Sequence, residues 1–119
     1  MAEMQKRNLD SPHETRTFDK GKVDVANFGN ITIGRAVLEP GWRWSESVKP
    51  IAKTESCQAP HTQYVISGRL KVVMDNGTED VFGPGDAAII PSGHDAWVVG
   101  DEPFVAVDFT GMKDYAVTK

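Results

Sequence analysis

The sequence predicts an all-β protein: one small antiparallel β-barrel or jelly roll. Short runs of β-branched and aromatic residues recur between residues 23 and 109, and turn residues close each run. The chain holds 7 Pro and 11 Gly, many of which lie between these runs, and this disfavours a helical bundle. A length of 119 residues corresponds to a single domain.

The elements are expected in the following order. Residues 1–20 are polar, charged and without an apolar period, which predicts a loose N-terminal arm ordered only by packing on a neighbour. The barrel is expected over residues 21–112, followed by a C-terminal tail over 113–119. Residues 47–60 contain Pro50 and Pro60 and no clear period, so we expect a long loop across the barrel mouth. The expected strands are 23–28, 31–38, 61–66, 70–74, 87–90, 96–99 and 104–109.

Two local patterns add detail. Asn76-Gly77 lies between alternating runs and predicts a hairpin with a type I′ turn. In the run 61–66, His61, Gln63 and Val65 fall on one face, because side chains alternate along a strand. If Val65 faces the core, His61 and Gln63 face the interior as well.

Charge and motif content exclude several classes of protein. The 13 Lys and Arg against 17 Asp and Glu give a net charge of −4, which disfavours nucleic-acid and anionic-membrane partners. No run approaches the ~20 apolar residues of a membrane helix, and the first sixteen residues lack the apolar region of a signal peptide. A single cysteine excludes an intramolecular disulfide and fits a reducing compartment, so we expect a cytoplasmic protein. No P-loop, dinucleotide fingerprint, nucleophile elbow, HExxH or CxxC occurs.

Three motifs in order make the chain resemble a known superfamily. The turn Glu39-Pro40-Gly41 comes first, residues 63–68 (QYVISG) follow, and residues 85–93 (GDAAIIPSG) keep the spacing Gly, five residues, Pro, one residue, Gly. Over residues 31–110 the chain thus resembles the cupin superfamily, of the small single-domain RmlC-like type. The resemblance implies a cupin-type barrel that commonly carries a metal in its interior.

The metal ligands that the resemblance implies are largely missing. Cupins usually supply two His from an H-x-H, one Glu and one later His. Here Gln63 stands in place of the Glu and Ala96 in place of the later His, and neither alignment of the H-x-H supplies a histidine. One of those alignments falls on Cys57 and Ala59. The usual four-ligand set is therefore absent.

An alternative metal set consists of His61, His94 and Cys57. His61 is on the inward face, Cys57 shares its parity if the strand extends back past Pro60, and His94 follows Gly93 at the barrel mouth. Neutral imidazole and thiolate bind Zn²⁺ or Fe²⁺ well. The expected cofactor is one divalent transition metal (Zn, Fe, Ni or Mn) with a fourth position open. The plain alternative has no metal. In it, His61 bonds to a neighbouring group, Cys57 packs as a small hydrophobic residue, and His94 is exposed or caps its turn.

Three further residues are candidates for ligand contact. Trp42 and Trp44 alternate around Arg43, and they are either core or dimer-interface residues or a stacking wall for a planar ligand. Gln63 is a candidate for substrate binding. Asp108 lies in an apolar strand, so we expect it to face water or to pair with a base such as Arg35.

Two functions follow from these residues. The first is a small-molecule enzyme, an isomerase, lyase or oxygenase, with His61 as ligand or general base and His94 as second ligand or acid–base group. The second is a non-catalytic module that binds or senses a small molecule with a degenerate metal site. Loss of the usual Glu and His favours the second, and retention of His61 and His94 keeps the first open. The expected partners are a small-molecule ligand and a second copy of the chain in a homodimer, because pairing would cover an exposed sheet edge.

Overall fold

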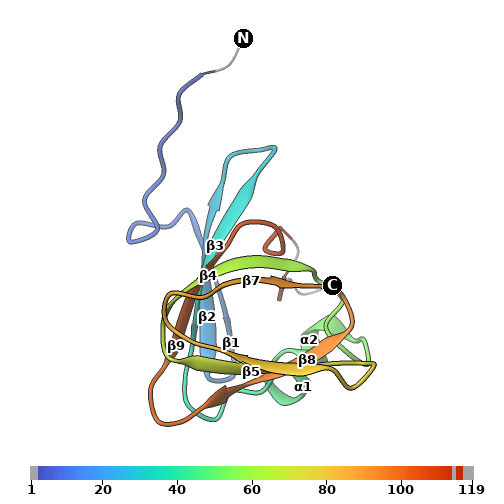
Figure 1. Ribbon diagram of the computed structural model, residues 1–119. Coiled ribbons are helices and arrows are strands. Elements are labelled where there is room, and N and C mark those ends of the chain that lie inside the picture. Colours follow the sequence, from blue (N-terminus) through green and yellow to red (C-terminus); the bar gives the residue numbers. More distant parts are fainter. Residues whose placement is uncertain (1–2, 114, 117–119) are drawn as a thin grey trace.

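Two antiparallel β-sheets face each other across one core in the computed structural model, which describes residues 3–113, 115 and 116 (Figure 1). The larger sheet has the strand order β1-β2-β3-β9-β4-β7, and the smaller has the order β6-β5-β8. The larger sheet comprises β1 (Glu14–Phe18), β2 (Gly21–Asn27), β3 (Thr32–Leu38), β9 (Phe104–Asp108), β4 (His61–Ser67) and β7 (Ala87–Ile90). The smaller comprises β6 (Glu79–Phe82), β5 (Arg69–Met74) and β8 (His94–Val99). The all-β, antiparallel fold class is thus confirmed.

The two sheets do not close into a continuous barrel. In the described part of the chain, no strand of one sheet pairs with a strand of the other. Two isolated bridges instead join β8 to the connection between β3 and β4, one between Arg43 and Trp97 and one between Cys57 and His94. The architecture is therefore a jelly-roll sandwich with backbone links along β8, the edge strand of the smaller sheet.

Alternation along the strands places the core as the sequence predicts. His61, Gln63 and Val65 are buried on β4, whereas Thr62 and Tyr64 on the same strand are exposed. Each fully buried Val, Leu or Phe contributes about 1.5–3 kcal/mol of hydrophobic stabilisation, so a register slip would be costly. The main core is formed by Leu38, Trp42, Trp44, Val48, Cys57, Val65, Leu70, Val72, Ala88, Ile90, Ala96, Val98, Phe104 and Ala106.

The first strand begins inside the segment expected to be a loose arm. Residues 14–18 form β1, which pairs with β2 from Glu14↔Val25 to Phe18↔Gly21. The alternating Thr and Arg side chains of β1 are polar enough to resemble an arm, yet they form the edge of a sheet. Upstream, the Arg35 guanidinium donates to the Asp10 carboxylate (2.7 Å) and to the Leu9 carbonyl (2.9 Å), so the arm packs on β3.

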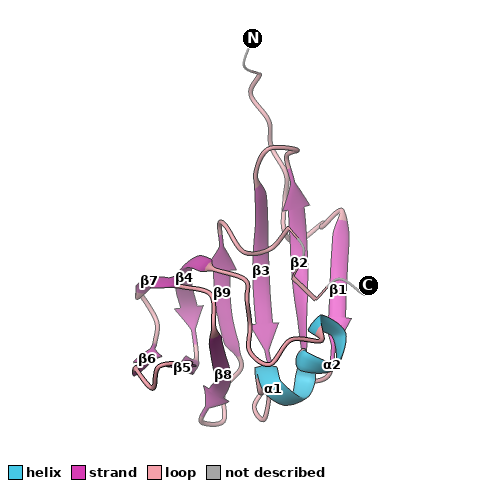
Figure 2. Cartoon of the chain, turned by 90° about the vertical axis from the view of Figure 1, so that its right-hand side faces the viewer, coloured by secondary structure: helices cyan, strands magenta, loops and turns pink. Residues whose placement is uncertain are grey.

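Two short helices interrupt the region expected to be a long loop: α1 (Trp44–Ser47) ends at its first residue, and α2 (Lys49–Ala52) lies within it. Pro50 lies at the start of α2, where its missing N–H costs no hydrogen bond. Figure 2 shows both helices at one end of the larger sheet. Trp44 and Val48 point into the core from this end. No helix among the described residues is long and apolar enough to cross a membrane.

The β5–β6 hairpin forms with a different turn from the expected type I′. Gly77 has a positive φ (91°), but Asn76 does not, and a type I′ turn requires both. The Gly77 N–H donates to the Met74 carbonyl (2.9 Å), and the Met74 N–H donates to the Thr78 carbonyl (2.8 Å). This pattern is that of a type I turn followed by a glycine bulge.

Candidate metal centre

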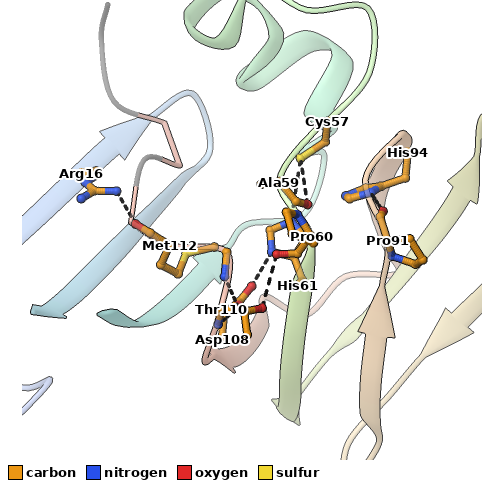
Figure 3. A network of polar contacts seen from close by, with 11 residues as sticks. Arg16, Cys57, Ala59, Pro60, His61, Pro91, His94, Asp108, Thr110 and Met112 are labelled. Carbon is orange, nitrogen blue, oxygen red and sulfur yellow. Dashed lines mark hydrogen bonds and ion pairs between the residues drawn. The ribbon is translucent and has the colours of Figure 1, made fainter. Parts of the chain in front are cut away.

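Three segments bring Cys57, His61 and His94 together at one end of the sandwich. His61 is the first residue of β4 and His94 the first of β8, so they come from opposite sheets. The Cys57 N–H donates to the His94 carbonyl (2.7 Å), and the Gly93 N–H donates to the Cys57 carbonyl (2.7 Å). These backbone bonds fix the thiol beside the start of β8. All three residues are buried, and their side chains point toward one another (Figure 3).

The donor atoms have the spacing of one metal ion. The ligand atoms of the three side chains lie within 4.8 Å of one another. Cys57 Sγ is 3.8 Å from His61 Nε2, and a tetrahedral Zn²⁺ with ordinary bond lengths would separate a sulfur and a nitrogen ligand by about 3.6 Å. Two His and one Cys satisfy three of four tetrahedral positions, so the residues fit a metal with one position open.

A second set of contacts fixes the orientation of both imidazoles. The Asp108 carboxylate bonds to Nδ1 of His61, and Nδ1 of His94 donates to the Pro91 carbonyl (2.8 Å). Each ring therefore turns its Nε2 edge toward the cluster, and Figure 3 shows both rings directed toward Cys57. Metal-binding histidines characteristically carry such a carboxylate or carbonyl partner on the second nitrogen.

Asp108 pairs with a base, as one of its two expected alternatives has it, but the base is His61 and not Arg35. It is 2% exposed and pairs with His61, while Arg35 bonds to Asp24 and Asp10. The other Asp108 oxygen accepts from the Thr110 and Gly111 N–H groups, each at 3.0 Å. Its place on the inward face could have been predicted, because it shares parity with Ala106 and Phe104.

The charges of the cluster favour a thiolate. Burial by itself would raise the pKa of the Cys57 thiol, but hydrogen bonds and positive charge from His61 and His94 lower it to about 6. Burial likewise disfavours a charged His61, but its contacts with Asp108 and Cys57 raise its pKa to about 9. The thiolate is the form of cysteine that binds metals, so Cys57 is already in the ionisation state that a metal ligand requires.

His94 is buried, in contrast to the exposed alternative, and it caps its turn, because Nδ1 donates to the Pro91 carbonyl. It is 3% exposed, and its ring centroid lies 5.3 Å from that of His61. It shares the buried face of β8 with Ala96 and Val98. Ala96, at the position of the missing family histidine, is buried in the main core and offers no ligand atom.

Gln63, Trp42 and Trp44 line a small inner cavity. They are not members of the donor cluster of Cys57, His61 and His94. This cavity holds about 40 Å³ and is also bordered by His61 and His94. Trp42 and Trp44 are each 2% exposed, so they are core residues that contact the cavity. Trp44 begins α1, so the predicted strand alternation around Arg43 does not extend to it. The indole N–H of Trp42 has no hydrogen-bond partner among the described residues.

A larger cleft opens on the outer side of the cluster. It has a volume of about 330 Å³ and lies between the helices, the chain before β4 and the C-terminal residues. Cys57 is part of its wall. The residues that line it are Trp44, Val48, Ala52, Thr54, Cys57, Gln58, Ala59, Pro60, Thr110, Gly111, Lys113, Tyr115 and Ala116. Sequence reasoning missed this cleft because the C-terminal segment that forms one wall was expected to be a tail.

Solved structures share this fold, although no family model and no curated protein matches the sequence. A protein of unknown function from Rhizobium leguminosarum bv. viciae 3841 is 23% identical, with a TM-score of 0.63 over 92% of this chain and 97% of that chain. Oxalate decarboxylase from Bacillus subtilis is 24% identical, with a TM-score of 0.55 over 83% of this chain and 27% of that chain. The 11S allergen from Cocos nucifera is 21% identical, with a TM-score of 0.58 over 88% of this chain and 33% of that chain.

The last two proteins are cupins, and this chain spans about a third or less of each. The fold is therefore cupin-like, as the sequence motifs predict. At these identities the similarity establishes the fold and no activity.

Proposed function

We propose that this protein, a single-domain cupin of the RmlC-like type, binds one divalent transition-metal ion through Cys57, His61 and His94. The observation that carries the proposal is the convergence of one sulfur and two imidazole nitrogens within 4.8 Å. A thiolate with two imidazoles favours Zn²⁺ or Fe²⁺ over Mn²⁺, which prefers oxygen ligands. Zn²⁺ is the first candidate, and Ni²⁺ and Mn²⁺ are the weaker ones.

The open fourth position would accept water or an atom of a small molecule. A bound metal supplies Lewis acidity and lowers the pKa of a bound water. The protein's own residues hold the ligands: Asp108 keeps Nε2 of His61 available, and Pro91 does the same for His94. Ligand pockets typically measure about 300–1,000 Å³. The outer cleft, at about 330 Å³, falls in this range, whereas the inner cavity, at about 40 Å³, does not. The small molecule would therefore occupy the outer cleft.

The reaction class stays open between two alternatives. As an enzyme, the protein would be a metal-dependent isomerase, lyase or oxygenase, with His61 and His94 next to the reacting atoms. As a binding or sensing module, it would hold a metal and a ligand without chemistry. The small inner cavity favours the second alternative, because it leaves little room for a substrate between the two sheets.

Elemental analysis of protein purified without chelator tests the metal site. We expect about one Zn or Fe per chain in the wild type and a loss of metal in Cys57→Ala, His61→Ala and His94→Ala. His13→Ala is the matched control, because His13 is exposed in the N-terminal arm. A wild type that binds no metal, even after incubation with Zn²⁺, Fe²⁺ or Co²⁺, would overturn the proposal.

A further inference from the structure

The two spaces beside the donor cluster meet at two aromatic side chains. The outer cleft has Cys57 in its wall, while the inner cavity has His61 and His94 in its wall. Among the described residues, Trp44 and Tyr115 line both spaces. A molecule that moves from the cleft to the imidazoles therefore passes these two rings.

Trp44 is the fixed side of this boundary. It starts α1 and belongs to the main core with Val48, so its movement would disrupt close packing between the sheets. Tyr115 lies outside both sheets, in the C-terminal segment (Met112, Lys113, Tyr115 and Ala116 among the described residues). Because no strand pairing fixes this segment, Tyr115 is the side that can move.

One arginine holds the C-terminal segment in place. Nη1 of Arg16, on β1, donates to the carbonyls of Met112 (2.6 Å) and Tyr115 (2.9 Å), and Nη2 donates to the carbonyl of Lys113 (3.0 Å). Figure 3 shows Arg16 reaching Met112 beside the cluster. The Glu14 carboxylate accepts from Nε of Arg16 (2.9 Å) and orients the guanidinium. Side-chain contacts of this kind open locally at less cost than a sheet.

The Tyr115 ring packs against one member of the cluster, His61. Its centroid is 5.7 Å from that of His61 and 6.3 Å from that of Phe18, with edge-to-face geometry in both pairs. Cys57 is 3% exposed although it belongs to the cleft wall, and its sulfur points toward His61. Because the Tyr115 ring packs against His61, it lies beside the approach to that sulfur from the imidazole side.

We propose that Tyr115, held by Arg16, sets the size limit for molecules that reach the Cys57, His61 and His94 donor atoms. The proposal rests on the proposed metal site for its biological meaning, but the size limit is a property of the protein alone. With Tyr115 in place, the inner cavity of about 40 Å³ admits ligands of about one to three non-hydrogen atoms. Larger ligands remain in the outer cleft.

Labelling of the metal-free protein tests the size limit. Cys57 is the sole cysteine, so every modification reports this site. A small reagent, methyl methanethiosulfonate, is compared with a bulky aromatic disulfide, dithiobis(2-nitrobenzoate). In each reaction the Cys57 thiolate forms a mixed disulfide and expels the leaving group, a sulfinate or an aromatic thiolate.

We expect Tyr115→Ala to raise the rate with the bulky reagent by about 10-fold or more, and the rate with the small reagent by less than about 3-fold. Tyr115→Phe keeps the ring and should keep both wild-type rates. Equal acceleration of both reagents, or no change in either, would overturn the proposal.

A second variant guards against a Tyr115→Ala protein that does not fold. Arg16→Gln keeps Tyr115 but removes most of the contacts that hold it, and we expect the same reagent-selective change. Arg7→Gln is its matched control, since Arg7 is exposed and contacts Phe28 in the N-terminal arm region. If the two labelling rates of Arg16→Gln equal those of Arg7→Gln, Arg16 does not hold Tyr115 in the position that limits ligand size.

Co²⁺-loaded protein separates this proposal from the metal proposal. Binding of azide and of imidazole is followed by the cobalt spectrum in the wild type and in Tyr115→Ala. We expect imidazole to bind about 10-fold more tightly in Tyr115→Ala and azide to change little. An unchanged ratio of the two affinities would count against the size limit. Absence of cobalt binding would contradict the metal proposal alone, and the labelling ratio would still decide the role of Tyr115.

Discussion

The Asp108 carboxylate determines which nitrogen of His61 faces the other two donors. It bonds to Nδ1 of His61 while its second oxygen accepts from the Thr110 and Gly111 backbone. An asparagine would keep the size and one acceptor oxygen but lose the charge. The residue thus offers a substitution that tests the electrostatic contribution of a buried carboxylate to the metal centre.

We expect Asp108→Asn to weaken metal binding by about 10–100-fold, because a carboxylate on the second nitrogen raises the basicity of the ligating imidazole. Competition with a chromophoric chelator measures the affinity. Asp101→Asn is the control, since Asp101 is exposed in the loop between β8 and β9. Equal affinities for wild type and Asp108→Asn would show that Asp108 has only a packing role.

The pH dependence of Cys57 reactivity follows from the same contacts. Its pKa falls from 9.0 to about 6 in the folded protein, so the thiolate persists as the pH is lowered from 9 and is lost as the pH falls through about 6. We expect the alkylation rate of the metal-free protein to be half-maximal near pH 6, and His61→Gln to move this midpoint upward. A wild-type rate that still rises up to pH 9 would contradict the thiolate.

At the scale of the element, the turn after β9 connects the metal centre to the C-terminal segment. Gly111 packs so closely that an added Cβ would lie 2.5 Å from the Pro60 carbonyl oxygen and 2.6 Å from Nδ1 of His61. A side chain at this position must therefore displace either the turn or the His61 ring.

We expect Gly111→Ala to destabilise the fold by about 1–3 kcal/mol and to weaken metal binding through the shifted His61. Urea unfolding and chelator competition measure the two effects. Gly83→Ala is the matched control, because its added Cβ would meet Arg69 at an ordinary 3.6 Å. A Gly111→Ala protein with wild-type stability and affinity would mean that the turn adapts freely.

Local alternation predicted the part of the site that lies within one strand. The inward face of His61, Gln63 and Val65 follows from the two-residue period of β4 alone. His94 was not placed this way, because the expected strand began at residue 96, whereas β8 begins at His94, on the same buried face as Ala96 and Val98. Trp44 lies in the core, which is one of its two expected alternatives, but the alternation expected around Arg43 ends where α1 begins, because core packing and not a local period fixes that helix.

At the scale of the whole molecule, one outer face of the larger sheet is apolar. The outward residues of the adjacent strands β9, β4 and β7 include no charged side chain. Ile89 is 79% exposed, Tyr64 and Ile66 are each 49% exposed, and Phe109 beside them is 46% exposed. Contiguous apolar surface of this kind characteristically marks an interface.

We expect a second copy of the chain to cover this face. The chain carries a net charge of −4, so two copies repel each other least where they meet through an uncharged surface. A twofold interface also pairs a patch with itself and needs no complementary charge. The predicted homodimer would therefore form through β4 and β7, leaving the cleft and the metal centre at the end of each sandwich free.

Sedimentation equilibrium tests this arrangement. We expect a mass of twice the 13.0 kDa chain for the wild type, and a shift toward the monomer in Ile89→Lys and Tyr64→Lys, because each would bury an unpaired charge at the interface. Ile31→Lys is the matched control: Ile31 is 50% exposed but lies between β2 and β3, away from the patch. A monomeric wild type would refute the dimer. If both patch variants remain dimeric, the interface lies on another face. If the monomeric variants still bind metal, each chain carries a complete metal site.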